Sequence, residues 1–284
     1  MTPAHLTLAV TLATALGTAP PPPGFALEGG VARVVPHFSA NAAPGRPLTE
    51  TFDFWTTRSA GAPPLERYDV EMTKQLHVVI VDADFATFGH VHATAASRGH
   101  LRTTYRFPHA GSYYVYTDSV PHGAGQQVFR WNVTAGPVAR GRLVLPRLGA
   151  PNDVARAGPY VVRLDRSTLA AGAETKLAVE VTENGAPAHD LHPYLGAAAH
   201  AVFLSGRDLS YVHVHPVDPH AAASGMAAMP GMDMPMPATL PAGAHVGAKM
   251  LLHARVAARG RYKLWLQFRG GDALEVAQFV LDAR

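Results

Sequence analysis

The chain contains no cysteine among its 284 residues, and this absence excludes several kinds of chemistry. Disulfide bonds, thiolate metal sites, cysteine nucleophiles and iron–sulfur clusters all require a cysteine. A blue-copper electron-transfer centre is excluded for the same reason, because its copper is bound by a cysteine sulfur. Any metal ion must therefore be held by histidine, methionine, carboxylate or backbone oxygen.

Charged residues and catalytic motifs are also scarce. Charged residues make up 16% of the chain, and the formal net charge is only +3. No cluster of Lys and Arg with interleaved aromatic residues is present, so we expect no nucleic-acid partner. No Ser-His-Asp arrangement, phosphate-binding loop or pair of carboxylates stands out, and the sequence therefore does not indicate an enzyme.

Long apolar runs are missing too. The run over residues 6–19 is shorter than the roughly 20 residues that cross a bilayer as a helix. Four prolines follow it, and Gly24 and Ala26 supply the small residues of a cleavage site, although no Lys or Arg precedes the run. These features predict a secretory signal peptide over residues 1–26. We expect a periplasmic or secreted protein with no stable membrane span after processing.

Turn-forming residues are abundant, with 26 Gly and 24 Pro. Segments of alternating apolar and polar residues predict short strands, for example over 113–117, 127–133, 177–182, 262–268 and 275–281. Glu-Asn-Gly at 183–185 is typical of a hairpin turn. The pattern predicts an all-β fold of two tandem immunoglobulin-like β-sandwiches, over residues 30–136 and 159–284, with a linker over 137–158.

One motif occurs twice, and it is the strongest functional feature of the chain. Each copy has a histidine, then a second one thirteen residues later, and a third two residues after that; the six are His77, His90, His92, His200, His213 and His215. The match extends to a shared Gly-Ala-Pro before each motif and a Gly-x-Tyr after it, at Gly111 and Gly260. The offset is 123 residues at the histidines and 149 at these glycines, so the second copy carries a net insertion of 26 residues. The chain is therefore predicted to be an internal duplication.

Strand geometry brings the three histidines of each copy together. Successive side chains of a strand alternate between its faces, so His90 and His92 share one face, as do His213 and His215. If the loop after the first histidine has the right parity, that histidine joins the same face of the neighbouring strand. Three imidazoles then converge on a metal ion, for which imidazole is the commonest protein ligand. The alternative is that these histidines are ordinary polar residues of amphipathic strands.

Further ligands are left open by the sequence. In the first repeat the candidates for a fourth ligand are Glu71, Met72, His109 and His122. In the second repeat they are His192, His253 and a methionine of the insertion, which spans about 217–245. Five methionines fall within eleven residues of that insertion: Met226, Met229, Met232, Met234 and Met236. A thioether is a soft ligand that selects Cu(I), whereas imidazole clusters accept Cu(II) or Zn(II), so we expect copper, with zinc as the alternative.

The sequence also resembles a group of bacterial exported proteins with two β-sandwich repeats and HVH(P) motifs. These are related to the YtkA-like and FixH-like domains associated with copper resistance. The resemblance rests on YLGAAAH at 194–200, DLSYVHVHP at 208–216 and AGSYYVY at 110–116. The resemblance implies an exported β-sandwich protein and says little about its activity. The first repeat departs from the pattern, because Ala93 stands where the second repeat has Pro216.

These observations favour an exported copper-binding protein, acting as chaperone, buffer or resistance factor. Its expected partners are the metal ion and an envelope copper transporter or oxidase. Two alternatives remain at this stage. One is a copper-dependent oxidoreductase, since His-x-His motifs also occur in copper enzymes. The other is a non-catalytic structural or adhesion module in which the histidines are incidental.

Overall fold

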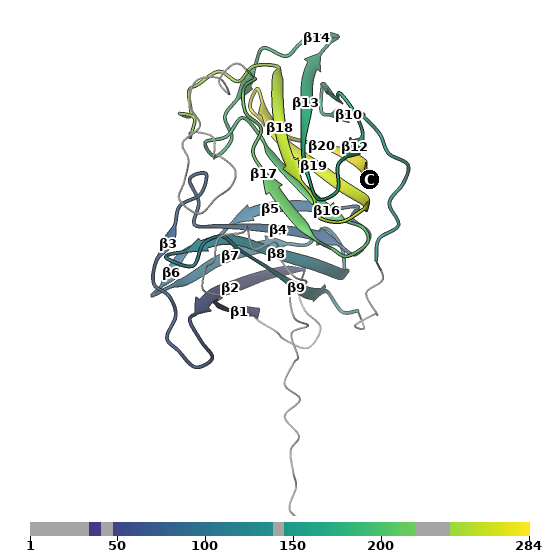
Figure 1. Ribbon diagram of the computed structural model, residues 1–284. Coiled ribbons are helices and arrows are strands. Elements are labelled where there is room, and N and C mark those ends of the chain that lie inside the picture. The colour runs from purple at the N-terminus through teal and green to yellow at the C-terminus, as the bar shows by residue number, and fades with distance from the viewer. Residues whose placement is uncertain (1–33, 41–47, 139–144, 220–238) are drawn as a thin grey trace, which may run out of the picture.

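The computed structural model describes residues 34–40, 48–138, 145–219 and 239–284. These residues form strands, turns and loops arranged as two β-sandwiches, one for each repeat (Figure 1). The predicted all-β fold of tandem immunoglobulin-like sandwiches is thereby confirmed. The predicted signal peptide and the five methionines of the insertion lie outside the described residues. Within the described ranges, no helix has the length and apolar character needed to cross a membrane.

The first repeat is built from two sheets. The outer sheet has the order β1-β2-β7-β6, and its strands are β1 (Val35–Ala40), β2 (Thr49–Thr57), β7 (His100–Arg106) and β6 (Thr94–Ser97). The inner sheet has the order β3-β8-β4-β5, with β9 also paired to β8. Its strands are β3 (Tyr68–Asp69), β8 (Gly111–Pro121), β4 (Leu76–Asp82), β5 (Phe88–His92) and β9 (Gln127–Ala135). Phe52, Val78 and Ile80 belong to the core between the two sheets.

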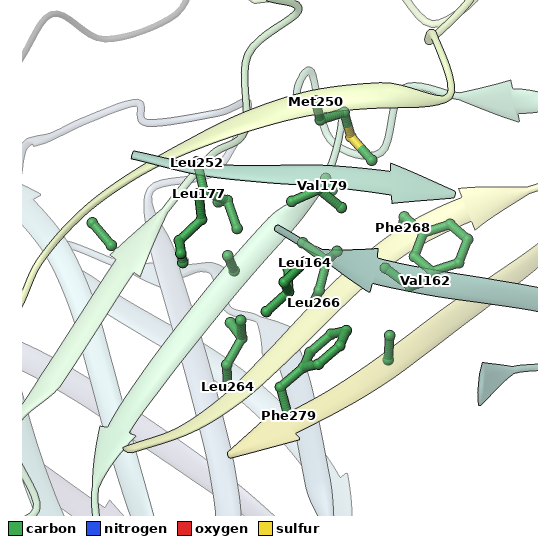
Figure 2. Packing of buried hydrophobic residues seen from close by; sticks show 14 of the residues in the cluster. Val162, Leu164, Leu177, Val179, Met250, Leu252, Leu264, Leu266, Phe268 and Phe279 are labelled. Carbon is green, nitrogen blue, oxygen red and sulfur yellow. The ribbon is translucent and has the colours of Figure 1, made fainter. Parts of the chain in front are cut away.

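The second repeat follows the same plan. Its outer sheet contains β10 (Val154–Ala157), β11 (Tyr160–Leu164), β13 (Glu174–Glu183), β14 (Ala186–Pro187) and β18 (Lys249–Arg255). Its inner sheet contains β12 (Thr168–Leu169), β20 (Ala273–Ala283), β19 (Gly260–Gly270), β16 (His200–Ser205), β17 (Tyr211–Val214) and β15 (Leu191–His192). Figure 2 shows how Leu164, Leu177 and Val179 of one sheet pack against Leu264, Leu266 and Phe279 of the other. Strand β10 begins inside the range expected for the linker.

Local features of the sequence set the turns and corners of both repeats. In the hairpin between β13 and β14, Asn184 and Gly185 have φ angles of 51° and 81°, which favour asparagine and glycine. Each Gly-x-Tyr forms a tyrosine corner: the hydroxyl of Tyr113 donates to His109 O at 2.7 Å, and that of Tyr262 donates to Ala258 O at 3.0 Å. The duplication seen in the sequence is therefore also a duplication of detailed geometry.

The inner sheets of the two repeats pack against each other, and this contact positions the site. In Figure 1, β4 and β5 of the first repeat lie beside β16 and β17 of the second. A separate apolar core lies between the sheets, formed by Val79, Val81, Phe85, Tyr114, Tyr116, Val202, Leu204, Leu209, Tyr211 and Trp265. The ring of Phe88 stacks on Trp265 at 5.1 Å, and Tyr116 stacks on Tyr211 at 5.2 Å. Burial of these aromatic side chains is a large stabilising contribution to the contact between the sandwiches.

Candidate metal centre

The structure brings the six histidines of both motifs into one cluster between the sandwiches. Strand alternation is the local reason. Val78 and Ile80 point into the core of the first repeat, so His77, Val79 and Val81 point to the opposite face, toward the second repeat. The same alternation turns His200, with Val202 and Leu204, toward the first repeat. The faces that carry the histidines are thus the two faces that meet.

Strand register fixes the members of each triad. His77 on β4 pairs directly with His92 on β5, so the loop has the parity that a three-imidazole cluster requires. In the second repeat Ala201 pairs with Val214, which places His200 level with His215. Side chains then approach closely: His77 Nδ1 lies 3.2 Å from His90 Nε2, and His200 Nδ1 lies 3.1 Å from His213 Nε2.

Four of the rings surround a common point. The rings are those of His77, His90, His200 and His213, and their six mutual centroid distances all fall between 5.1 and 5.9 Å. Such a set is nearly a regular tetrahedron, whose centre lies about 3.3 Å from each ring centroid. An ion bound to an imidazole nitrogen at about 2.0 to 2.1 Å lies about 3.2 Å from that ring's centroid. One ligand nitrogen from each of the four residues lies within 4.8 Å of the other three. A single tetrahedrally coordinated ion fits this arrangement.

Backbone carbonyls fix the tautomer of the first histidine in each repeat. His77 Nε2 lies 3.1 Å from Glu71 O, and His200 Nε2 lies 3.1 Å from Tyr194 O. A carbonyl oxygen only accepts hydrogen bonds, so each Nε2 carries the proton and donates. The Nδ1 atom of each ring is then an unprotonated lone-pair donor that faces the centre. Metal-binding histidines are commonly held through their outer nitrogen in this way.

Two matching tight turns present these carbonyls. The turn after Glu71 has positive φ at both Met72 (42°) and Thr73 (67°). The turn after Tyr194 has positive φ at Leu195 (52°) and Gly196 (82°). Positive φ costs energy at residues other than glycine, so three of these four positions hold a strained backbone. Such strain clusters at functional sites, and here it aims one carbonyl at one imidazole in each repeat.

The second histidine of each motif is held by the opposite repeat. His90 Nδ1 donates to Gln267 Oε1 of the second repeat at 2.9 Å. His213 Nδ1 lies 3.5 Å from Asp118 Oδ2 of the first repeat. Their Nε2 atoms face the centre. Each of the four central rings therefore has an oxygen atom near its outer nitrogen, and the hydrogen bond between His90 and Gln267 links the two sandwiches at the site.

Charge explains why a metal ion suits this cluster. With the outer nitrogens protonated, the facing nitrogens of His77 and His90 are both lone pairs only 3.2 Å apart, and they repel each other unless a cation lies between them. A proton is a poor candidate, because burial lowers the pKa of His77 to about 4 and those of His90 and His213 well below the usual value. Neutral imidazoles are the form that binds metal.

The third histidine of each motif flanks the central four. The ring of His92 lies 5.0 Å from that of His77, and His215 Nε2 lies 3.2 Å from His200 Nδ1. Burial, and after it the electrostatic effect of His77, lowers the pKa of both rings to about 3. The buried His92 Nε2 has no hydrogen-bond partner among the described residues. These two imidazoles are therefore candidates for additional neutral ligands at the edge of the cluster.

The open candidates for a further ligand are mostly elsewhere. His109, His122 and His253 each pair with a carboxylate, from Asp82, Asp69 and Glu174 respectively, away from the cluster. His192 is exposed, and Met72 is buried in the turn described above. Glu71 contributes its backbone carbonyl, while burial and then the charge of Asp118 raise the pKa of its carboxyl to about 8.

Sequence reasoning missed Asp118 and Gln267, although the repeat contains a signal for them. Asp118 follows Gly111 by seven residues, and Gln267 follows Gly260 by seven. The two therefore occupy equivalent positions, and in the structure they are the cross-strand neighbours of His77 and His200. Extending the alignment of the repeats past Gly-x-Tyr would have placed both beside the first histidine of their own motif. It would not have shown that each contacts the motif of the other repeat.

Comparison with known proteins adds little beyond the fold. Residues 154–284, the second repeat, match a family described as a domain of unknown function (DUF8832). No curated protein matches the sequence. Similar solved structures include a tetra-tandem repeat from the extending region of a large adhesion protein, with 11% identity and a TM-score of 0.27 over 89% of this chain and 50% of that one. The adhesin InvE of Yersinia pseudotuberculosis has 11% identity and a TM-score of 0.26, over 90% and 61%. Invasin, a bacterial integrin-binding protein, has 10% identity and a TM-score of 0.23, over 88% and 39%.

The chain thus spans between about two fifths and three fifths of these three structures. Their TM-scores are too low to support any transfer of function. The candidate metal centre has to be interpreted from its own geometry.

Proposed function

We propose that this chain is an exported copper-binding protein, a buffer, chaperone or resistance factor, that holds one ion between its two sandwiches. The observation that carries the proposal is the tetrahedron of His77, His90, His200 and His213, two from each repeat. Each repeat supplies only half of these ligands, so the two motifs act as one site. Four neutral nitrogen ligands at a buried position are suited to holding a soft or borderline transition-metal ion.

Binding is favoured over catalysis by the completeness of the ligand set. Catalytic metal sites of tetrahedral type keep one position for water or substrate, whereas structural sites fill all four with protein ligands. Here the protein supplies four central imidazoles, and His92 and His215 flank them. His90 is 7% exposed and His200 is fully buried, which leaves little room for a substrate. The site therefore suits retention and transfer of an ion better than turnover.

Geometry and composition together favour copper in its reduced state. A tetrahedral set of imidazoles suits the d¹⁰ ions Zn(II) and Cu(I), whereas Cu(II) prefers tetragonal coordination. The sequence adds five thioethers between residues 226 and 236, and the first of them follows the last motif histidine, His215, by eleven positions. Thioethers select Cu(I) over Zn(II). We infer that Cu(I) is the resident ion and that Zn(II) competes with it for the site. We also infer that Cu(I) is exchanged with an envelope copper transporter or oxidase.

The test is a metal titration of the mature full chain under anaerobic conditions, with Cu(I) and with Zn(II) as competitor. We expect one tightly held ion in the imidazole centre, with four nitrogen ligands at about 2.0 to 2.1 Å by X-ray absorption. The double variants His90→Ala/His92→Ala and His213→Ala/His215→Ala should each abolish that same ion. The control variant His109→Ala/His122→Ala removes two exposed histidines of carboxylate pairs and should bind as the wild type does.

Other results would contradict specific parts of the proposal. Two ions, each lost with its own motif, would overturn the shared centre and restore two separate sites. Tight Zn(II) binding that Cu(I) does not displace would overturn copper as the cargo. Binding no tighter than that of the denatured chain would overturn a metal function altogether.

A further inference from the structure

The two halves of the metal centre are related by the duplication but are chemically unequal. Asp118 on β8 lies beside His77, and Gln267 on β19 lies beside His200. Each reaches across to the other repeat, Gln267 to His90 and Asp118 to His213. The outer nitrogen of His90 therefore faces a neutral amide, and the outer nitrogen of His213 faces a carboxylate.

Asp118 is a buried carboxylate whose neighbours include Gln126 and the Tyr211 hydroxyl. Its side chain is 0% exposed. One carboxylate oxygen, Oδ1, accepts a hydrogen bond from Gln126 Nε2 at 2.8 Å. The other, Oδ2, has no hydrogen-bond partner among the described residues, and neither has His213 Nδ1, which it faces at 3.5 Å. Burial of a carboxylate is costly, and a cation near Oδ2 would offset part of that cost.

A carboxylate behind a ligand histidine has two effects on a bound cation. It accepts the outer N–H and makes the inner nitrogen a stronger electron-pair donor. It also places negative charge next to a cation that is otherwise surrounded by neutral imidazoles, where the low dielectric of the interior strengthens the attraction. Gln267 can orient His90, but as a neutral amide it supplies neither effect to the same degree.

We propose that Asp118 is the affinity-determining positioning residue of the centre, which acts through His213 and makes it the strongest of the four ligands. This inference rests on the proposed metal function and deepens it. It assigns unequal roles to two histidines that the duplicated sequence presents as equivalents. Asp118 itself does not bind the ion; it acts on it through the imidazole and through its charge.

The test exchanges the two positions. Asp118→Asn should weaken binding of Cu(I) and of Zn(II) by about 10- to 100-fold, the usual effect of losing such a partner, while the stoichiometry stays the same. Gln267→Glu should tighten binding in an otherwise wild-type chain. The double variant Asp118→Asn/Gln267→Glu moves the carboxylate behind His90 and should recover most of the lost affinity. Asp69→Asn, which alters an exposed His–Asp pair, is the matched control.

The exchange also separates a role in the centre from a purely structural one. If Asp118 only supports packing through Gln126, Asp118→Asn leaves the affinity unchanged and Gln267→Glu restores nothing; that result overturns the inference. If Asp118→Asn does not fold, the metal affinity of Gln267→Glu tests the inference by itself. An affinity of that variant equal to or weaker than that of the wild type contradicts the charge argument. If the wild-type chain binds neither Cu(I) nor Zn(II), it is the metal function that fails, which is a different outcome from a bound ion that is insensitive to Asp118.

Discussion

Gln267 of the second repeat accepts a hydrogen bond from His90 of the first, with 2.9 Å between Oε1 and Nδ1. The two residues are 177 positions apart in the chain. This bond fixes the orientation of a central imidazole from outside its own sandwich. The candidate metal centre and the contact between the sandwiches therefore depend on each other, and a change at either should affect both.

Metal binding should stabilise the folded protein measurably. An ion that binds only the folded state adds about 2.7 kcal/mol to the free energy of unfolding at a free concentration of 100 times Kd. We expect a rise in the thermal unfolding midpoint when Cu(I) is added, and its reversal by a chelator. The variant His90→Ala, which removes one of the four central ligands, should show no such rise. Equal stabilisation of the variant and the wild type would mean that the ion binds elsewhere.

The metal-free protein should lose stability as the pH falls below neutrality. The pKa of His77 is lowered to about 4 and those of His92 and His215 to about 3, and the pKa values of the other three are well below the ordinary value, in each case chiefly by burial. In the unfolded chain histidine titrates near pH 6.5. Between pH 6.5 and about 4 the unfolded state thus binds protons that the folded state does not, and the free energy of unfolding decreases.

Two carboxyls oppose this trend. Burial raises the pKa of Glu71 to about 8 and that of Asp118 to about 6, so the folded state retains up to two protons there against up to six bound by unfolded histidines. Below about pH 6.5 the net slope should still exceed about 1.4 kcal/mol per pH unit, the value for one proton. Urea unfolding of the metal-free chain at several pH values between 7 and 4.5 measures it. A flat profile would mean that the imidazoles are solvated.

Tyr116→Phe should weaken the contact between the sandwiches. The Tyr116 hydroxyl donates to Leu209 O of the other repeat at 3.0 Å, and its loss leaves a buried carbonyl without that bond. We expect a loss of about 1 to 2 kcal/mol in unfolding free energy and a several-fold loss of metal affinity. Tyr113→Phe removes a similar bond to His109 O within the first sandwich. It should lower stability alone, and a matching loss of metal affinity there would contradict the coupling.

Gly89→Ala should displace the strand that carries His90 and His92. A Cβ atom at Gly89 would lie 2.6 Å from the ring of Tyr105, which is too close for a real contact. Overpacking of this kind costs about 1 to 3 kcal/mol, and we expect weaker metal binding with it because β5 or the Tyr105 ring must shift. Gly243→Ala is the control, since nothing lies within 4 Å of its added Cβ. Titration and urea unfolding of both variants test the expectation.

Much of this architecture is visible in the sequence because it depends on local patterns. Period-two alternation predicts the strands, and the same alternation puts His90 and His92 on one face. Gly-x-Tyr predicts the corner that Tyr113 and Tyr262 form. The continuous apolar run LHVVIV also carried a signal that both faces of its strand are buried. That signal is weaker than the alternation, because an apolar run does not tell which part of the chain covers the second face of the strand.

The sequence by itself determined two sandwiches and, in each, two imidazoles on one face of a strand, because side-chain direction along a strand follows from its own backbone. The strand register in the structure then placed the third imidazole of each motif on that face. Only the tertiary structure decided that these faces meet and that four imidazoles surround one point. That outcome depends on how Phe88 and Tyr116 of one repeat pack against Trp265 and Tyr211 of the other. Such packing is a property of two surfaces built from distant segments, and no local pattern of residues encodes it.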